Sequence, residues 1–249
     1  MLDNISFNRF YNIDSEIRNM NPISKILCVM IFLILTFLES SIKFNLVLVG
    51  ILVLIMFFSK IPFKVYLKIV LSLLSFIIFI FLINFLCKTS INQSILFSIR
   101  LILIVLYSSV LTMTTTPSEL VYGLEHILSP LKIFKVPVSS LALILSLAIR
   151  FIPTVFDECK KIVKAYECRG INFKSLKLKQ KLLYLKSIIV PMFILSIKNS
   201  DEVADNFSLK LYDSNVNRTE LYVLPYTKVD AYMLCFHFML VMMIVVKGF

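Results

Sequence analysis

The residues that could carry out catalysis are few in this chain and lie far apart. A phosphate-binding loop needs several glycines close together, and the four glycines here are widely separated. The two histidines, His126 and His237, lack a carboxylate, cysteine or second histidine at the spacing of metal ligands. We therefore predict no catalytic residue, no metal site and no other cofactor. We expect His126 on a helix surface and His237 in a packed or interfacial position.

The cysteines give no sign of a disulfide framework or a zinc site. Their number is odd, they are scattered along the chain, and no Cys-x-x-Cys pair occurs. The five residues are Cys28, Cys87, Cys159, Cys168 and Cys235.

One arginine is a candidate binding residue. The segment KAYECRGINF, residues 164–173, ends a charged amphipathic helix with Cys168, Arg169 and Gly170. A cation at a helix C-terminus is favoured by the helix dipole, by about 0.3–1 kcal/mol. An arginine inserted into a partner protein often contributes about 2 kcal/mol or more. From the chemistry of the residues alone, both interpretations of Arg169 stay open.

The composition is that of a membrane protein. Of 249 residues, 59% are hydrophobic and 16% are charged, whereas soluble domains carry roughly 25% charged residues. The net charge of +11 is spread over an apolar chain. In membrane proteins such an excess faces the cytoplasm and the anionic headgroups of the lipid bilayer, so we do not interpret it as nucleic-acid binding.

Five apolar runs predict about five transmembrane helices in an all-α polytopic membrane protein. A spanning helix needs about 20 apolar residues, so the first two runs are short and require lysines such as Lys43 and Lys60 to reach the interface. The polar N-terminal segment lacks the pattern of a signal peptide. The runs cover residues 23–38, 44–58, 65–86, 95–113 and 231–246.

The distribution of basic residues predicts the orientation in the cell membrane. The second loop contains Lys60, Lys64 and Lys68, and the long block between the fourth and fifth runs holds most of the lysines. The positive-inside rule then places the N-terminus, the second loop and this block in the cytoplasm. With five spans, the C-terminus is expected outside.

The block between the fourth and fifth runs begins with a short predicted helix. Thr116 is suited to be its N-cap, Pro117 its first residue and Glu119 an acid in the first turn. The helix is expected to end before Pro130.

Two long predicted helices follow, at about 139–168 and 180–211. Each is apolar at first, contains a proline (Pro153 or Pro191) and ends in a polar, basic half. Gly170 is suited to end the first of them in a left-handed cap. The polar halves would be costly in lipid, so we expect a cytoplasmic platform rather than two more spans.

Residues 114–173 resemble the signature region of the transmembrane component, or T subunit, of energy-coupling factor (ECF) transporters, which is shared with cobalt-transport relatives. The matching elements are Thr-Thr-x-Pro, Leu-Ser-Pro-Leu-Lys, Arg-Phe-Ile-Pro and an Arg-Gly that precedes Asn-Phe. Near the N-terminus, Asn21, Pro22, Ser24 and Lys25 stand where the family has Asp-Pro-x-Thr-Lys. The resemblance covers nearly the whole chain.

The resemblance implies a non-catalytic membrane scaffold of an ABC-type importer for a vitamin or a transition-metal ion. Two ATPase subunits would drive it, and a separate membrane-embedded S subunit would bind the substrate. The expected parts are N-terminal transmembrane helices in residues 1–115, a cytoplasmic coupling-helix domain in 116–228 and a C-terminal transmembrane helix in 229–249. The cargo, and whether this chain serves one or several S subunits, stay open.

In this family each coupling helix ends in a small-Arg-small motif that docks in a groove of one ATPase. The first motif corresponds to Cys168, Arg169 and Gly170, with Cys in place of the usual Ala. The second falls on Leu209, Lys210 and Leu211, because Arg218-Thr219 fits the family's Arg-Thr downstream. Lysine lacks the planar fork of arginine, and leucines replace small residues. Either this end docks differently, or its coupling is weakened.

Three alternatives remain. A self-contained secondary transporter would need a polar site at the membrane midplane, but the predicted spans contain no Asp or Glu. A membrane-embedded enzyme of lipid or prenyl chemistry would need clustered acids, histidines or arginines near the interface. The third alternative is a divergent T subunit that no longer couples to the ATPases, and the Leu-Lys-Leu motif supports it.

Overall fold

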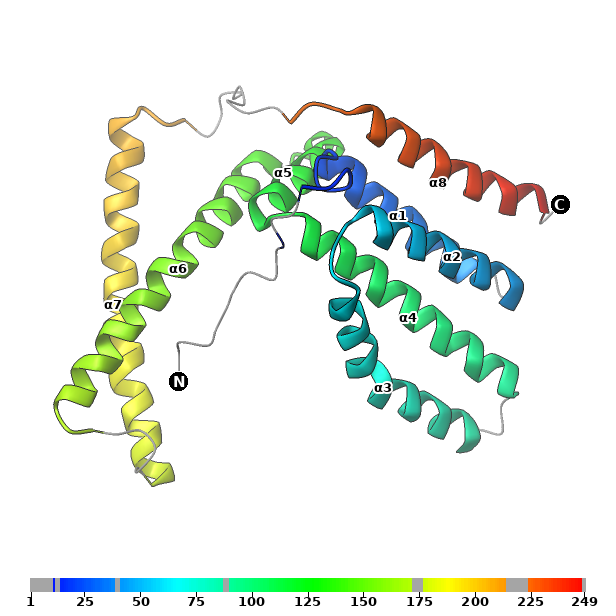
Figure 1. Cartoon of the computed structure of the whole chain (residues 1–249). Coiled ribbons are helices and arrows are strands. Elements are labelled where there is room, and N and C mark those ends of the chain that lie inside the picture. Colours follow the sequence, from blue (N-terminus) through cyan, green and yellow to red (C-terminus); the bar gives the residue numbers. More distant parts are fainter. Residues whose placement is uncertain are drawn as a thin grey trace. The chain divides into compact units, whose positions relative to one another are not determined.

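The described part of the chain is built of helices, as predicted. The computed structural model describes residues 11, 14–38, 41–86, 90–171, 177–213 and 224–247 (Figure 1). Among these residues the regular elements are α1 (Pro22–Leu38), α2 (Ile42–Phe58), α3 (Phe63–Leu86), α4 (Ile91–Thr114), α5 (Pro117–Leu128), the 3₁₀ helix η1 (Ser129–Phe134), α6 (Val138–Cys168), α7 (Leu178–Leu209) and α8 (Lys228–Lys247).

The helices form two compact units. Elements α1 to α5, η1 and α8 make up one unit, which we call the bundle. Helices α6 and α7 make up the other, which we call the helix pair. By contacts, the change of unit falls at Lys135, and α5 packs on α1 within the bundle. The coupling-helix domain expected in residues 116–228 is defined by its place in the cytoplasm and stays a prediction.

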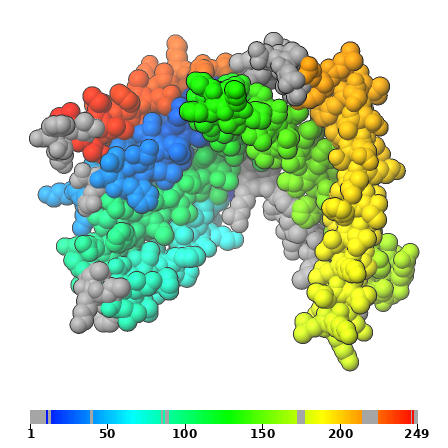
Figure 2. Space-filling view, turned by 180° about the vertical axis from the view of Figure 1, so that it is seen from behind, coloured from blue at the N-terminus to red at the C-terminus, as the bar shows by residue number. Residues whose placement is uncertain are grey.

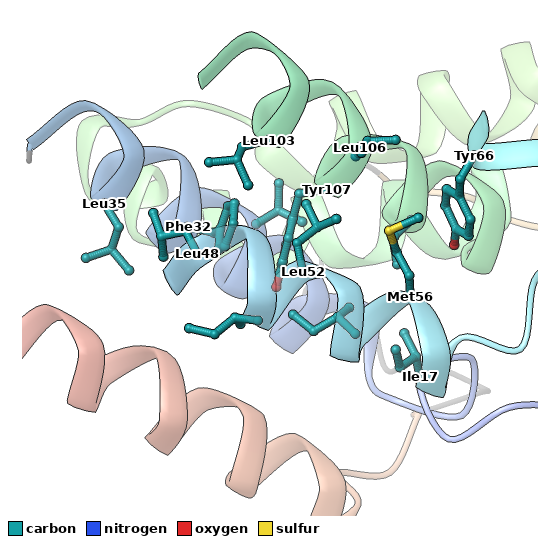
Figure 3. Packing of buried hydrophobic residues seen from close by; sticks show 14 of the residues in the cluster. Ile17, Phe32, Leu35, Leu48, Leu52, Met56, Tyr66, Leu103, Leu106 and Tyr107 are labelled. Carbon is teal, nitrogen blue, oxygen red and sulfur yellow. The ribbon is translucent and has the colours of Figure 1, made fainter. Parts of the chain in front are cut away.

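The core of the bundle lies where α1, α2 and α4 meet (Figure 3). The ring of Phe32 on α1 stacks on that of Tyr107 on α4, with 4.2 Å between the ring centroids. Leu48 and Leu52 of α2 and Leu103 of α4 are buried around this pair. Helix α8 packs on the side of α1, and α3 packs on α4.

Apolar helices of spanning length occur in both units. Helices α1 and α2 have 17 residues each, as short as the sequence indicated. Within the described residues, four segments are long and apolar enough to cross a membrane by length and composition: Phe63–Asn84, Ile91–Thr114, Val138–Cys168 and Leu178–Leu209. The last two are the helices expected to form a platform. Figure 2 shows one face of α7, coloured yellow to orange, exposed along the helix.

Helix α5 begins with the cap that the sequence predicts. The Thr116 hydroxyl accepts a hydrogen bond from the N–H of Glu119 (3.3 Å), and the Glu119 carboxylate accepts one from the N–H of Thr116 (2.8 Å). Two orphan N–H groups of the first turn are thereby satisfied, which fixes where the helix starts. Gly123 of α5 lies directly against α1: a Cβ there would come within 2.7 Å of the Ile26 side chain and 3.3 Å of Pro22.

Replacing Gly123 by leucine is expected to lower the stability of the bundle by about 2 kcal/mol. A side chain at this position overpacks the contact with α1, and this outweighs the roughly 1 kcal/mol gained in helix propensity. Gly50→Leu is the matched control, because a Cβ at Gly50 meets no atom within 4 Å. Thermal unfolding in detergent, followed by circular dichroism at the helical band, measures both. Equal unfolding temperatures for the two variants would contradict the close approach of α5 to α1.

Candidate functional site

The two helices of the helix pair run antiparallel, as their contacts show. Near the end of α6, Tyr166 packs edge-on against Tyr184 near the start of α7, with ring centroids 5.6 Å apart. The Tyr166 hydroxyl also donates to the carbonyl of Ser187 (3.3 Å). Earlier on α6, Glu158 accepts a hydrogen bond from the side-chain amide of Asn199, which lies later on α7 (3.0 Å).

The candidate site residues lie at the C-terminal ends of these two helices. We call them the first tip (Cys168, Arg169 and Gly170) and the second tip (Leu209, Lys210 and Leu211). All six residues are exposed. Because the helices are antiparallel, the tips lie at opposite ends of the helix pair. From Tyr184, which packs beside the last turns of α6, to Lys210 the chain rises by about 40 Å at about 1.5 Å per residue.

The first tip is a Schellman cap, the hydrogen-bonded turn that commonly ends helices. The N–H of Gly170 donates to the carbonyl of Glu167 (2.9 Å), and the N–H of Ile171 donates to that of Tyr166 (3.2 Å). Gly170 has φ 81°, the left-handed conformation that glycine adopts without strain. The left-handed cap predicted at Gly170 is confirmed, and Arg169 occupies the C-cap position.

The side chain of Arg169 is exposed and lies against an aromatic ring. Its guanidinium carbon lies 5.8 Å from the centroid of the Tyr166 ring, within the range of a cation–π contact. No ion pair of Arg169 with a carboxylate occurs in the described part of the chain. The tip thus presents a positive charge on an aromatic support, held by a residue that also packs against α7.

The second tip has the same backbone geometry. The N–H of Leu211 donates to the carbonyl of Ser208, and the N–H of Tyr212 to that of Phe207, both at 3.0 Å. The rings of Phe207 and Tyr212 contact each other, with centroids 4.9 Å apart. This is the apolar contact that accompanies a Schellman cap. Lys210 holds the C-cap position.

The two tips therefore match in shape although they differ in sequence. The C-cap dihedral angles are φ −83° and ψ 9° at Arg169, and φ −86° and ψ 9° at Lys210. The next residue is left-handed in both, with φ 81° at Gly170 and 52° at Leu211. A left-handed leucine costs about 1–2 kcal/mol, so the geometry is maintained against the preference of the residue. Arg218 and Thr219, which supported the placement of this motif, lie outside the described residues.

A second cation lies beside Lys210 and was not predicted. The middle of α6 and the end of α7 enclose a cleft of about 320 Å³. Arg150 of α6 and Lys210 of α7 line it together with the polar side chains of Thr154 and Asn206. Arg150 belongs to the Arg-Phe-Ile-Pro element. The sequence matched this element to the family without indicating what Arg150 faces, because the pairing of α6 with α7 decides that.

In the bundle, the N-terminal Asn-Pro-x-Ser-Lys element is a structural anchor. Asp230 at the start of α8 is 1% exposed, and its carboxylate accepts hydrogen bonds from the N–H of Asn21 (2.8 Å) and the N–H of Thr227 (2.6 Å). The Lys25 ammonium donates to the carbonyl of Thr114 at the end of α4 (3.3 Å). These contacts tie α1 to α4 and α8. Sequence reasoning missed Asp230 entirely.

The histidines are placed as structural residues. His237 is fully buried: its Nε2 accepts a hydrogen bond from the Tyr107 hydroxyl, and its Nδ1–H donates to the Met233 carbonyl, both at 2.8 Å. The prediction of a packed position for His237 is confirmed. His126 is half-buried, with Nδ1 3.1 Å from the Tyr122 carbonyl. Within the described residues, no group of three or more His, Cys, Asp or Glu side chains could hold a metal ion.

Comparison with known proteins supports the family resemblance found in the sequence. The fold is that of an all-α polytopic membrane protein. The profile of the family described as "Cobalt transport protein" (CbiQ) matches residues 14–221. The chain therefore belongs to the CbiQ family, and it is the transmembrane T component of an energy-coupling factor transporter.

Several curated relatives carry the name "Energy-coupling factor transporter transmembrane protein EcfT". The one from Acidaminococcus fermentans is 31% identical, over 93% of this chain and 92% of the relative. That from Bacillus subtilis is 28% identical, over 92% and 93%. That from Lactobacillus helveticus is 38% identical over a shorter stretch, 61% of this chain and 54% of the relative. The recognition made from the signature residues is thus confirmed.

Proposed function

We propose that this T component transmits ATP-driven motion from a pair of cytoplasmic ATPase subunits to a substrate-binding S subunit in the membrane. The chain itself is not an enzyme, and ATP hydrolysis takes place in the partner chains. The observation that carries the proposal is the pair of matching helix tips. Each presents a cation at the end of a long helix, with backbone geometry that one kind of groove can accept.

The spacing of the tips supports two docking points rather than one. A separation of about 40 Å along α7 is comparable with the diameter of a small domain, so each tip reaches a different partner subunit. Rigid helices between the tips transmit a displacement of one ATPase relative to the other. Their exposed apolar faces, which include Ile144 and Phe193, are the surfaces on which the S subunit and lipid would pack.

The orientation follows from the same proposal. The tips and the N-terminus face the cytoplasm, where ATP is available, and α6 and α7 form the coupling platform. The polar second halves of these helices support this placement. The transported substrate is a vitamin or a transition-metal ion, chosen by the S subunit.

Cys168 allows the docking of the first tip to be tested without altering Arg169. The thiol is exposed at the tip, and Cys235 on α8 is an exposed thiol in the bundle. Each is kept as the single cysteine, labelled with a photoreactive maleimide and irradiated in the complex co-expressed with its ATPase pair. We expect Cys168 to crosslink to an ATPase subunit and Cys235 not to. Failure to co-purify any ATPase, or equal crosslinking from both positions, would contradict the proposal.

A T subunit with weakened coupling is the second candidate, since leucines flank the cation of the second tip. This variant of the proposal predicts that both ATPases bind while substrate uptake is slow. The matching backbone of the two tips favours full coupling. The self-contained secondary transporter has less support, because the curated relatives carry the name of one component of an energy-coupling factor transporter.

A further inference from the structure

The bundle contains a large apolar pocket that the coupling role does not use. It has a volume of about 570 Å³ and lies where α2 ends and α3 begins. Its floor is formed by Met56, Ile61 and Tyr66, all buried. Met56 and Tyr66 lie close together at this end of α2 in Figure 3. The Tyr66 hydroxyl donates a hydrogen bond to the Ser59 hydroxyl (3.4 Å), and the side chains of Met56 and Ile61 are apolar.

The rim of the pocket is apolar as well, but exposed. Phe57, Phe58 and Phe63 surround the opening, and 81% of Phe57 is accessible. Three exposed phenylalanines around a hollow are unfavourable in water, and they are suited to contact with a hydrocarbon chain. The pocket lies at the ends of two apolar helices of a membrane protein, which is the depth at which acyl chains begin.

The charges beside the pocket are mainly positive. Lys60 lines it, and Lys64 and Lys68 follow on the first two turns of α3, four residues apart on one face. Glu16 is the carboxylate among the lining residues. The N-terminus of α3 opens at the same place, with no acidic residue in its first turn, so the helix dipole adds positive potential there.

The backbone holds Lys60 at this position against its preference. Lys60 has φ 55°, a left-handed conformation that favours glycine. Its N–H donates to the carbonyl of Phe57 at the end of α2 (3.2 Å). At this position a glycine would be unstrained, whereas a lysine is strained. Backbone strain of this kind is found mainly at functional positions.

We propose that this pocket binds one anionic phospholipid, with an acyl chain among the phenylalanines and the phosphodiester between Lys60 and the start of α3. Basic pockets at the ends of transmembrane helices bind anionic headgroups in this way. A free phosphate ion would leave the apolar pocket empty, and an acidic peptide would place backbone groups against the phenylalanine rim. A lipid satisfies both parts of the site.

The absence of tryptophan from the chain permits a direct test. Phe58→Trp introduces a single fluorophore into the pocket of the full-length protein, which is reconstituted into mixed vesicles. Quenching by dibrominated phosphatidylglycerol is compared with quenching by dibrominated phosphatidylcholine. We expect the relative binding constant to favour phosphatidylglycerol about tenfold. Adding Lys60→Gln should lower this preference about fivefold, because one lysine near a membrane surface contributes about 1 kcal/mol to the binding of anionic lipid.

Two matched controls make the result specific. Lys43→Gln removes the same charge at the opposite end of α2, and we expect it to leave the constant within twofold of its value. Leu46→Trp places the reporter at an exposed position of α2 distant from the pocket, where we expect no preference. Three outcomes would overturn the proposal. The first is a relative binding constant near one for the Phe58→Trp protein, and the second is an equal effect of Lys43→Gln and Lys60→Gln on that constant. The third is binding of phosphatidylethanolamine as strong as that of phosphatidylglycerol. None of these outcomes bears on ATPase binding.

Discussion

Arg169→Glu is expected to weaken the association of this chain with its ATPase partner by at least about 30-fold. A well-placed interfacial arginine contributes about 2 kcal/mol or more, and each 1.4 kcal/mol changes an equilibrium constant tenfold. Reversal of the charge adds repulsion from any carboxylate that accepts the guanidinium. Arg169 lies at a rigid cap and is exposed, so its substitution disturbs no packed core.

The measurement is quantitative pull-down in detergent of the chain co-expressed with its candidate ATPase pair. Lys161→Glu is the matched control, because it reverses an exposed charge on α6 two turns before the tip. We expect this control to retain both ATPases. If Arg169→Glu retained them equally well, Arg169 would be only a favourable charge at the end of a helix.

Lys210→Glu in the same experiment compares the two tips. Lysine is a point charge without the bidentate fork of arginine, so we expect a smaller loss, about fivefold. Its cleft also contains Arg150, which keeps a positive charge there after the substitution. A loss as large as that of Arg169→Glu would mean that Lys210 contributes as much to docking as the arginine does.

The helices were predictable because their signals are local. Apolar runs and the capping residue Thr116 indicated where helices begin and continue, and the observed bounds agree within a few residues. Gly170 was predictable for the same reason, since glycine is the residue that favours a left-handed cap.

Leu211 shows where local reasoning ends. A leucine does not indicate a left-handed conformation, and the sequence left open whether the second tip docks differently or couples more weakly. The structure has the same cap because Phe207 and Tyr212 pack together and the last carbonyls of α7 find their donors. The contacts of the cap outweigh the propensity of one residue.

The remaining misses concern residues far apart in the chain. Arg150 lines the same cleft as Lys210 only through the antiparallel register of α6 and α7. Asp230 meets Asn21 across 209 positions. The close approach of α5 to α1 at Gly123 is a further contact of this kind. A single sequence carries no direct signal for such pairings.

The buried anchor at the start of α8 leads to the second large effect. Asp230→Ala is expected to destabilise the bundle by about 2–4 kcal/mol, because the buried N–H of Asn21 and the half-buried N–H of Thr227 lose their acceptor. Helix α8 packs along α1, which carries Cys28, a thiol that is 2% exposed. The labelling rate of Cys28, kept as the single cysteine, therefore reports opening of this contact.

We expect Cys28 in the Asp230→Ala variant to react about 30-fold faster than in the parent, as the loss of about 2 kcal/mol implies. Asp230→Asn retains one carbonyl oxygen as acceptor and should lie between the two. Asp201→Ala removes an exposed aspartate from α7 and should leave the rate unchanged. If Asp230→Ala reacted no faster than this control, the carboxylate would not hold α8 to α1. The Asn-Pro-x-Ser-Lys element would then need another explanation.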